Sequence, residues 1–74
     1  MALSFHQAFG AAVRRRRHAA GLSQEDFAEQ AGIHRTYVSR IEAGKVDVGL
    51  GAARRLAKAL GARLSTLIRD VEAD

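Results

Sequence analysis

Four residue types are missing from this 74-residue sequence: cysteine, proline, tryptophan and asparagine. Without cysteine the chain can form neither a disulfide bond nor a thiolate metal site. The remaining composition is rich in alanine, leucine and arginine, which favours helices almost everywhere. No apolar run approaches the ~20 residues that cross a bilayer, and the first residues lack the basic and apolar segments of a signal peptide. We therefore expect a cytoplasmic protein with no membrane partner.

Aromatic side chains are also few, namely Phe5, Phe9, Phe27 and Tyr37. A chain this short buries only about 60% of the surface that its unfolded form exposes. The sequence therefore predicts a single domain over residues 1–74, and dimerisation would be a source of further burial.

The formal net charge is +4 and is unevenly distributed. The run Arg14–Arg17 precedes an acidic segment at 24–34, and residues 35–63 contain seven basic and two acidic residues. A basic middle segment suits a protein that presents one face to a polyanion. Arginines that only lie on solvent-exposed faces would give the same composition. The charge alone therefore does not distinguish a polyanion-binding face from an ordinary solvated surface. Because the four arginines cover every side of a helix turn, at most one or two of them can point at one partner.

Helix boundaries are indicated by glycine and by apolar spacing. Gly21, Gly32, Gly44 and Gly61 stand where helices are expected to end. Ser23 begins an S-x-x-D capping box with Asp26. The first predicted helix has Ser4 as a candidate N-cap, and Phe5 and Phe9 share one of its faces. In the fourth predicted helix, Leu50 is the first residue of an apolar stripe. The pattern predicts an all-α, compact five-helix bundle, with helices at about residues 4–20, 24–31, 35–43, 50–60 and 64–71.

The second and third helices, joined by a short turn at Gly32, form a helix-turn-helix unit. The apolar face of the third helix consists only of Val38 and Ile41, so we expect its polar face to bind a partner. In such a unit the second helix enters the major groove of DNA. Arginine can bind guanine O6 and N7 together. The candidates for reading bases are Arg35, Thr36, Ser39 and Arg40, and those for binding phosphates are Gln24, Tyr37 and Lys45.

Other chemistry finds little support. His6, His18 and His34 match no metal-ligand spacing and are expected as surface or capping residues. Glu25 and Asp26 are adjacent on a helix and so do not face one another. The sequence contains no activated nucleophile, phosphate-cradling glycine loop or cofactor motif. We expect no enzyme, no cofactor and no metal.

Three motifs occur together and in order: L-S-Q-E-x-x-A from Leu22, R-x-x-V-S-R-I-E from Arg35, and A-x-x-L-G from Ala57. With these the chain resembles the Cro/phage-repressor-type helix-turn-helix family, also called the xenobiotic-response-element family. Within it, Arg-Thr-Tyr-Val-Ser is similar to the restriction–modification controller proteins, which are stand-alone five-helix dimers. The resemblance places the base-reading and phosphate-binding candidates at the family's DNA-contacting positions. It also implies a structural ion pair between Arg17 and Glu42, which would lock the first helix to the third.

The fifth predicted helix has apolar residues along one face: Leu64, Leu67, Ile68 and Val71. This stripe either completes the monomer core or forms a two-fold interface with a second copy. We expect a shared role, with Leu64 and Leu67 mostly inward and Ile68 and Val71 nearer the partner.

The leading hypothesis is a homodimeric transcriptional regulator that binds a palindromic operator in double-stranded DNA, with RNA polymerase as a candidate protein partner. It would control its own promoter, as the controller of a restriction–modification system. No residues are left for a ligand domain, so no small-molecule effector is expected. The alternatives are the antitoxin of a toxin–antitoxin pair and a protein-interaction adaptor with the same fold.

Overall fold

The computed structural model describes residues 3–72 and places five α-helices there. The remaining residues of the expected domain, 1, 2, 73 and 74, lie outside this range. The predicted all-α, five-helix architecture is confirmed, and each helix begins and ends within one residue of its expected position. The helices are α1 (Phe5–Ala19), α2 (Gln24–Ala31), α3 (Arg35–Glu42), α4 (Leu50–Ala59) and α5 (Leu64–Glu72).

The two serine caps differ in completeness. Ser4 Oγ accepts a hydrogen bond from the Gln7 amide, and Gln7 Oε1 accepts one in return from the Ser4 amide. At α2, Ser23 Oγ accepts from the Asp26 amide at 3.0 Å, but among the described residues the reciprocal bond is absent. The capping box expected at Ser23 is therefore only half formed. Aspartate is one methylene shorter than the glutamate or glutamine that completes such a box.

The turn between α2 and α3 has a cap at each side. Gly32 has φ of +69°, a left-handed conformation that glycine adopts without steric cost. His34 Nδ1 then accepts a hydrogen bond from the Thr36 amide at 3.3 Å, so that a histidine caps α3. The predicted ends at the other three glycines are formed in the same way, with positive φ at Gly21, Gly44 and Gly61.

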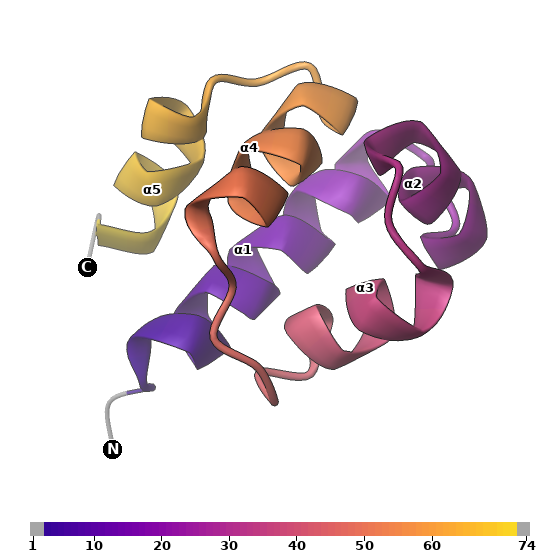
Figure 1. Cartoon of the computed structure of the whole chain (residues 1–74). Helices are drawn as coiled ribbons and strands as arrows, with labels where there is room; N and C mark the ends of the chain where they lie inside the picture. The colour runs from indigo at the N-terminus through magenta and orange to yellow at the C-terminus, as the bar shows by residue number, and fades with distance from the viewer. Residues whose placement is uncertain (1–2, 73–74) are drawn as a thin grey trace.

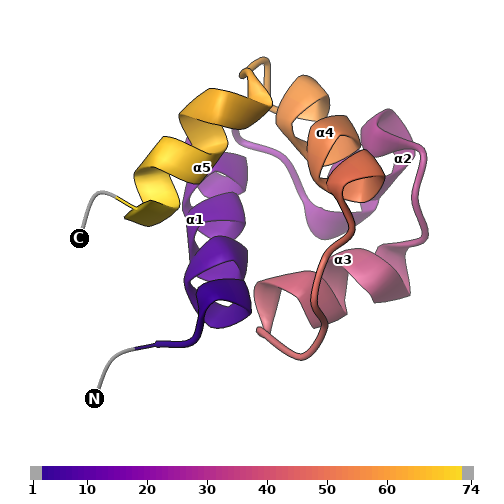
Figure 2. The same cartoon turned by 60° about the vertical axis from the view of Figure 1, so that its left-hand side comes forward.

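All five helices contribute buried side chains to a single core, and Figures 1 and 2 show how the helices are arranged. α1 contacts α3 and α5, whereas α2 contacts α3 and α4, and α4 contacts α5. In both views α3 lies at an edge of the bundle. The largest fully buried side chains are Val13, Phe27, Val38, Ile41, Leu56 and Leu67.

Two apolar residues predicted to face the core lie on the surface instead. Phe5 is 55% exposed and Leu50 is 78% exposed. Both are the first residue of their helix, so they lie beyond the turns that the neighbouring helices cover. The apolar spacing identified which face of each helix is buried, but not how far along the helix the neighbouring helices cover that face.

A glycine in the middle of α1 sets how closely α1 approaches α3. A Cβ atom at Gly10 would lie 2.1 Å from the carbonyl oxygen of Ile41 and 3.2 Å from the Cα of Glu42. These are backbone atoms of the last turn of α3, and they cannot move aside as a flexible side chain can. Gly10 therefore allows the two helix backbones to come into direct contact.

Candidate nucleic-acid interface

The exposed face of α3 carries the four predicted base-reading residues. Val38 and Ile41 are fully buried and hold the opposite face against the core. The four predicted base-reading residues are all exposed, and residues three or four positions apart on a helix lie on the same side. The helix thus presents one continuous polar face, formed by Arg35, Thr36, Ser39 and Arg40.

The three predicted phosphate-binding residues lie in different environments around this face. Lys45 is exposed, and its backbone N–H donates to the carbonyl of Arg40 at 3.0 Å. Tyr37 is half-buried and packs against the core cluster. Gln24 is also half-buried, and its Nε2 donates to Glu42 Oε1 at 3.2 Å. Of the three, Lys45 has the greatest freedom to reach a ligand.

A buried ion pair connects α1 to α3. Arg17 Nε donates to Glu42 Oε2 at 2.6 Å, and Arg17 Nη2 donates to Glu42 Oε1 at 2.9 Å. The two side chains are only 8% and 3% exposed. Arg17 Nη1 also donates to the carbonyl oxygen of Leu22 at 2.8 Å. One guanidinium thus joins the C-terminal turn of α3 to α1 and to the segment before α2.

The electrostatics of this pair favour the charged form of Arg17. Hydrogen bonds to Glu42 raise the pKa of Arg17 above its ordinary value, and the negative charge of Glu42 adds to this effect, against the opposing cost of burial. A two-point contact of this kind restricts orientation as well as distance. The pair therefore fixes how α3 is presented on the surface.

Comparison with known proteins places this arrangement in a family. The family model of the helix-turn-helix domain matches residues 8–68. The chain is 44% identical over 57 residues to control protein C.MunI from Mycoplasma sp, covering 77% of each chain. It belongs to the helix-turn-helix family of control proteins.

Solved structures agree with this assignment. The restriction–modification controller protein C.AhdI from Aeromonas hydrophila superposes with a TM-score of 0.81 at 39% identity, over 84% of this chain and 94% of that one. The controller C.Esp1396I, solved as a tetramer in complex with its natural 35 base-pair operator, gives a TM-score of 0.82 over 96% of this chain and 99% of that one. At 21% identity the second likeness concerns the fold alone.

A second ion pair, which the sequence did not indicate, holds α5 of this control-protein fold against α1. Arg16 Nε donates to Asp70 Oδ2, and both side chains are partly exposed. The hydrogen bond from Arg16 lowers the pKa of Asp70 below its ordinary value, and the positive charges of Arg15 and Arg69 add to this effect. The only sequence signal was the arginine run itself, and it gave no indication of a partner 54 residues away.

The four apolar residues of α5 do not form one free surface. Leu67 is fully buried, so it belongs to the monomer core and cannot contact a second chain. The sequence predicts a mostly inward Leu67, and its full burial leaves the other three residues of the stripe as interface candidates. Leu64, Ile68 and Val71 are half-buried and pack against the edge of the core. Ile68 also lines a cavity of about 60 Å³ together with the exposed Phe5 and Leu50.

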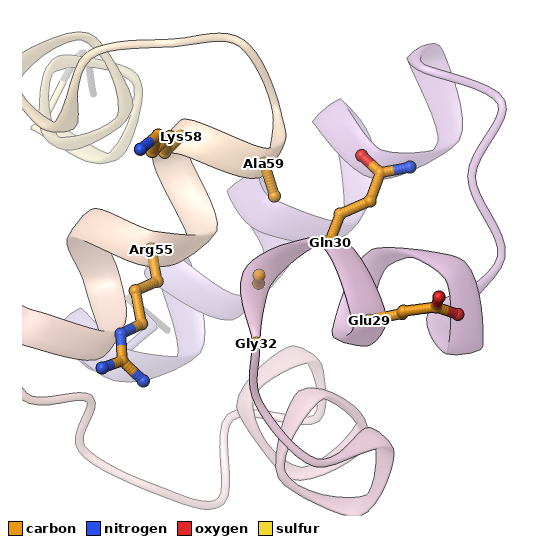
Figure 3. Close-up of a pocket in the computed structure, with 7 residues that line it drawn as sticks. Glu29, Gln30, Gly32, Arg55, Lys58 and Ala59 are labelled. Carbon is orange, nitrogen blue, oxygen red and sulfur yellow. The ribbon is translucent and has the colours of Figure 1, made fainter.

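An open hollow lies between α2 and α4 (Figure 3). Arg55 and Lys58 extend from α4, whereas Glu29 and Gln30 extend from α2 in other directions. Polar groups that diverge in this way do not form the converging lining of a small-molecule site. Over residues 3–72 no three histidine or acidic side chains gather as metal ligands would. None of the helices in that range combines the length and the hydropathy of a membrane span.

Proposed function

We propose that this chain is a sequence-specific, DNA-binding transcriptional regulator that binds a palindromic operator as a homodimer. Its role would be that of a controller of a restriction–modification system that also acts on its own promoter. The observation that carries the proposal is the polar face of α3, held outward by a buried ion pair in a chain 44% identical to a control protein.

The geometry suggests a separate role for each part of α3. Arg35 opens the helix, and the N-terminal residues of a recognition helix are the ones that reach base edges. Its guanidinium can donate to guanine O6 and N7, and the Thr36 methyl can contact a thymine methyl. Ser39 and Arg40, one turn further along, lie on the same exposed side. Lys45 follows the helix and would bind a phosphate, with Gln24 and Tyr37 as further phosphate contacts.

A homodimer would present two such helices related by a two-fold axis, about 34 Å apart, and these would match a palindrome. For the dimer surface we propose Leu64, Ile68 and Val71 of α5, extended by Phe5 and Leu50. Exposed apolar residues that lie next to one another mark interaction sites more often than scattered ones do. C.Esp1396I, which shares the fold, was solved as a tetramer on its operator, and we propose self-association on DNA for this chain as well.

The regulator is favoured over the two alternatives. Three control proteins and a restriction–modification controller protein are among the relatives, and none of these is named as an antitoxin or an adaptor. RNA polymerase would be a partner if the regulator activates its promoter. Without an effector, the concentration of the protein itself would be sensed through dimer assembly.

A gel shift with the DNA upstream of the chain's own gene tests the proposal. The control is a duplex of equal length and composition with a shuffled sequence. The upstream duplex should be retained at salt concentrations at which the shuffled one is released, because base contacts survive the loss of electrostatic attraction to phosphates. Equal, salt-sensitive binding to both duplexes, or no binding to either, would contradict the proposed function.

A further inference from the structure

The four consecutive arginines of α1 lie in separate environments. Arg17 is buried against Glu42, and Arg16 is paired with Asp70. Arg14 and Arg15 are exposed, and neither forms an ion pair with any of residues 3–72. Two positive charges of the run are therefore free, and the fold directs them to different places.

Arg14 lies where α1, α2 and α3 meet. It comes three residues before Arg17, so the two share a side of α1. With Gln24 of α2 and Ser39 of α3 it borders an open polar hollow of about 240 Å³. The floor of this hollow is the ion pair of Arg17 and Glu42.

The hollow carries a net positive charge. Glu42 contributes its only negative charge, and both carboxylate oxygens already accept hydrogen bonds from Arg17. Gln24 Nε2 donates to the same carboxylate. Because Arg17 balances Glu42, the charge of Arg14 has no counterpart among the residues that line the hollow.

The hollow opens beside the polar face of α3. Ser39 belongs both to that face and to the wall of the hollow. A duplex with its major groove on α3 would bring the sugar–phosphate backbone that borders the groove to this side of the helix. The guanidinium of Arg14, which has no negative partner in the hollow, would then lie close to a phosphate of that backbone.

We propose that Arg14 binds a backbone phosphate of duplex DNA at this hollow, opposite Gln24. The inference rests on the proposed function and adds a contact that is independent of base sequence. Arginine is well suited to this phosphate contact, because its planar guanidinium can donate two hydrogen bonds to one phosphate. Arg14 would thus fix the register of α3 in the groove without reading a base.

Arg15 provides a matched control. It is the next residue, equally charged and also exposed. It does not line the hollow, whereas its charge contributes to lowering the pKa of Asp70 on α5. Arg14→Gln and Arg15→Gln remove the same charge from neighbouring positions that differ only in what they face.

The test measures affinity for the upstream duplex and for a shuffled duplex over a range of salt concentrations. Arg14→Gln should weaken binding to both duplexes by a similar factor. It should also reduce the magnitude of the slope of log K against log salt by about 1.8, because each subunit of the homodimer loses one phosphate contact worth about 0.9. Arg15→Gln should leave the slope close to that of the wild type, and Arg14→Lys should restore most of it. Equal slope changes in the two glutamine variants would overturn the inference.

A second readout locates the contact on the DNA. Phosphates of the upstream duplex are replaced one at a time by uncharged methylphosphonates. In each half-site, one replacement should weaken the wild-type protein and have no further effect on Arg14→Gln, whereas the remaining replacements should affect both proteins alike. If every replacement weakens both proteins alike, Arg14 contacts no phosphate. If the wild type binds specifically but the slope changes are equal, or every methylphosphonate weakens both proteins alike, only this inference is overturned. If the wild type shows no specific binding, the proposed function is overturned.

Discussion

Arg17 of α1 holds Glu42 of α3 through two hydrogen bonds, of 2.6 Å and 2.9 Å, at a site where both side chains are more than nine-tenths buried. The pair is a structural link between the longest helix and the proposed recognition helix. The pair positions α3 and does not itself contact DNA, because both charges are already paired with each other.

Breaking this pair should destabilise the fold strongly. In Arg17→Met the carboxylate of Glu42 would stay buried without its partner, and such a loss costs about 3–5 kcal/mol. Urea unfolding followed by circular dichroism measures the change. The double variant Arg17→Met with Glu42→Leu should recover much of the loss, because no buried charge remains. A cost below about 1 kcal/mol for the single variant would contradict the role of the pair.

Gly10→Ala should also lower stability, although alanine is the better helix former. The added methyl group would lie 2.1 Å from the Ile41 carbonyl oxygen, and forced repacking of this kind costs about 1–3 kcal/mol. Gly51→Ala is the control, since a Cβ there meets nothing within 4 Å. That variant should be unchanged or gain up to about 1 kcal/mol from helix propensity. A stabilising effect of Gly10→Ala in thermal unfolding would mean that α1 and α3 are further apart than described.

The pair of Arg16 and Asp70 should make α5 sensitive to acid. The pKa of Asp70 lies below its ordinary value of 3.8, so the stabilisation is complete above that value and is lost as the pH falls through the lowered pKa. Because both side chains are about one-third exposed, the contribution at neutral pH should be small, about 0–1 kcal/mol. A double-mutant cycle with Arg16→Met and Asp70→Asn isolates this coupling. The coupling should be measurable at pH 7 and should vanish in strong acid, and a coupling that is equal at both would refute the assignment.

Self-association should depend on the exposed Leu50. Leu50→Asp places a charge in the proposed dimer surface, and it should weaken the dimer at little cost to the monomer because the side chain is 78% exposed. Gln30→Asp adds the same charge at an exposed position of α2 and should leave association unchanged. Sedimentation equilibrium measures the dissociation constant of each variant. Equal association of the two variants would place the interface elsewhere.

The sequence predicted the helices and the face of α3 because both depend on local patterns. Glycines that end helices, a serine before α2 and apolar residues at helical spacing act within one or two turns. Val38 and Ile41 alone determined which side of α3 is buried, and the polar residues between them followed. The pairing of Arg17 with Glu42 came from family resemblance, since nothing local connects positions 25 residues apart.

The features that the sequence did not reveal depend on how helices meet. Asp70 finds Arg16 only after α5 has packed along α1, and the need for glycine at position 10 arises only where α3 crosses it. The exposure of Phe5 and Leu50 depends on where the neighbouring helices stop. The hollow beside Arg14 requires three helices to converge, so the arginine run could not show which member faces it.

Footprinting at base resolution determines whether α3 reads bases in the register that begins with Arg35. The wild type should protect two major-groove segments of the upstream DNA, related by a dyad and about one helical turn apart. Arg35→Ala should cost about 1–3 kcal/mol and relax base preference at one position in each half-site. Lys45→Ala should weaken all sequences alike and lower the salt slope by about one per subunit, and so by about two for the homodimer. If Arg35→Ala keeps full base preference at every position, α3 does not read DNA in the register described.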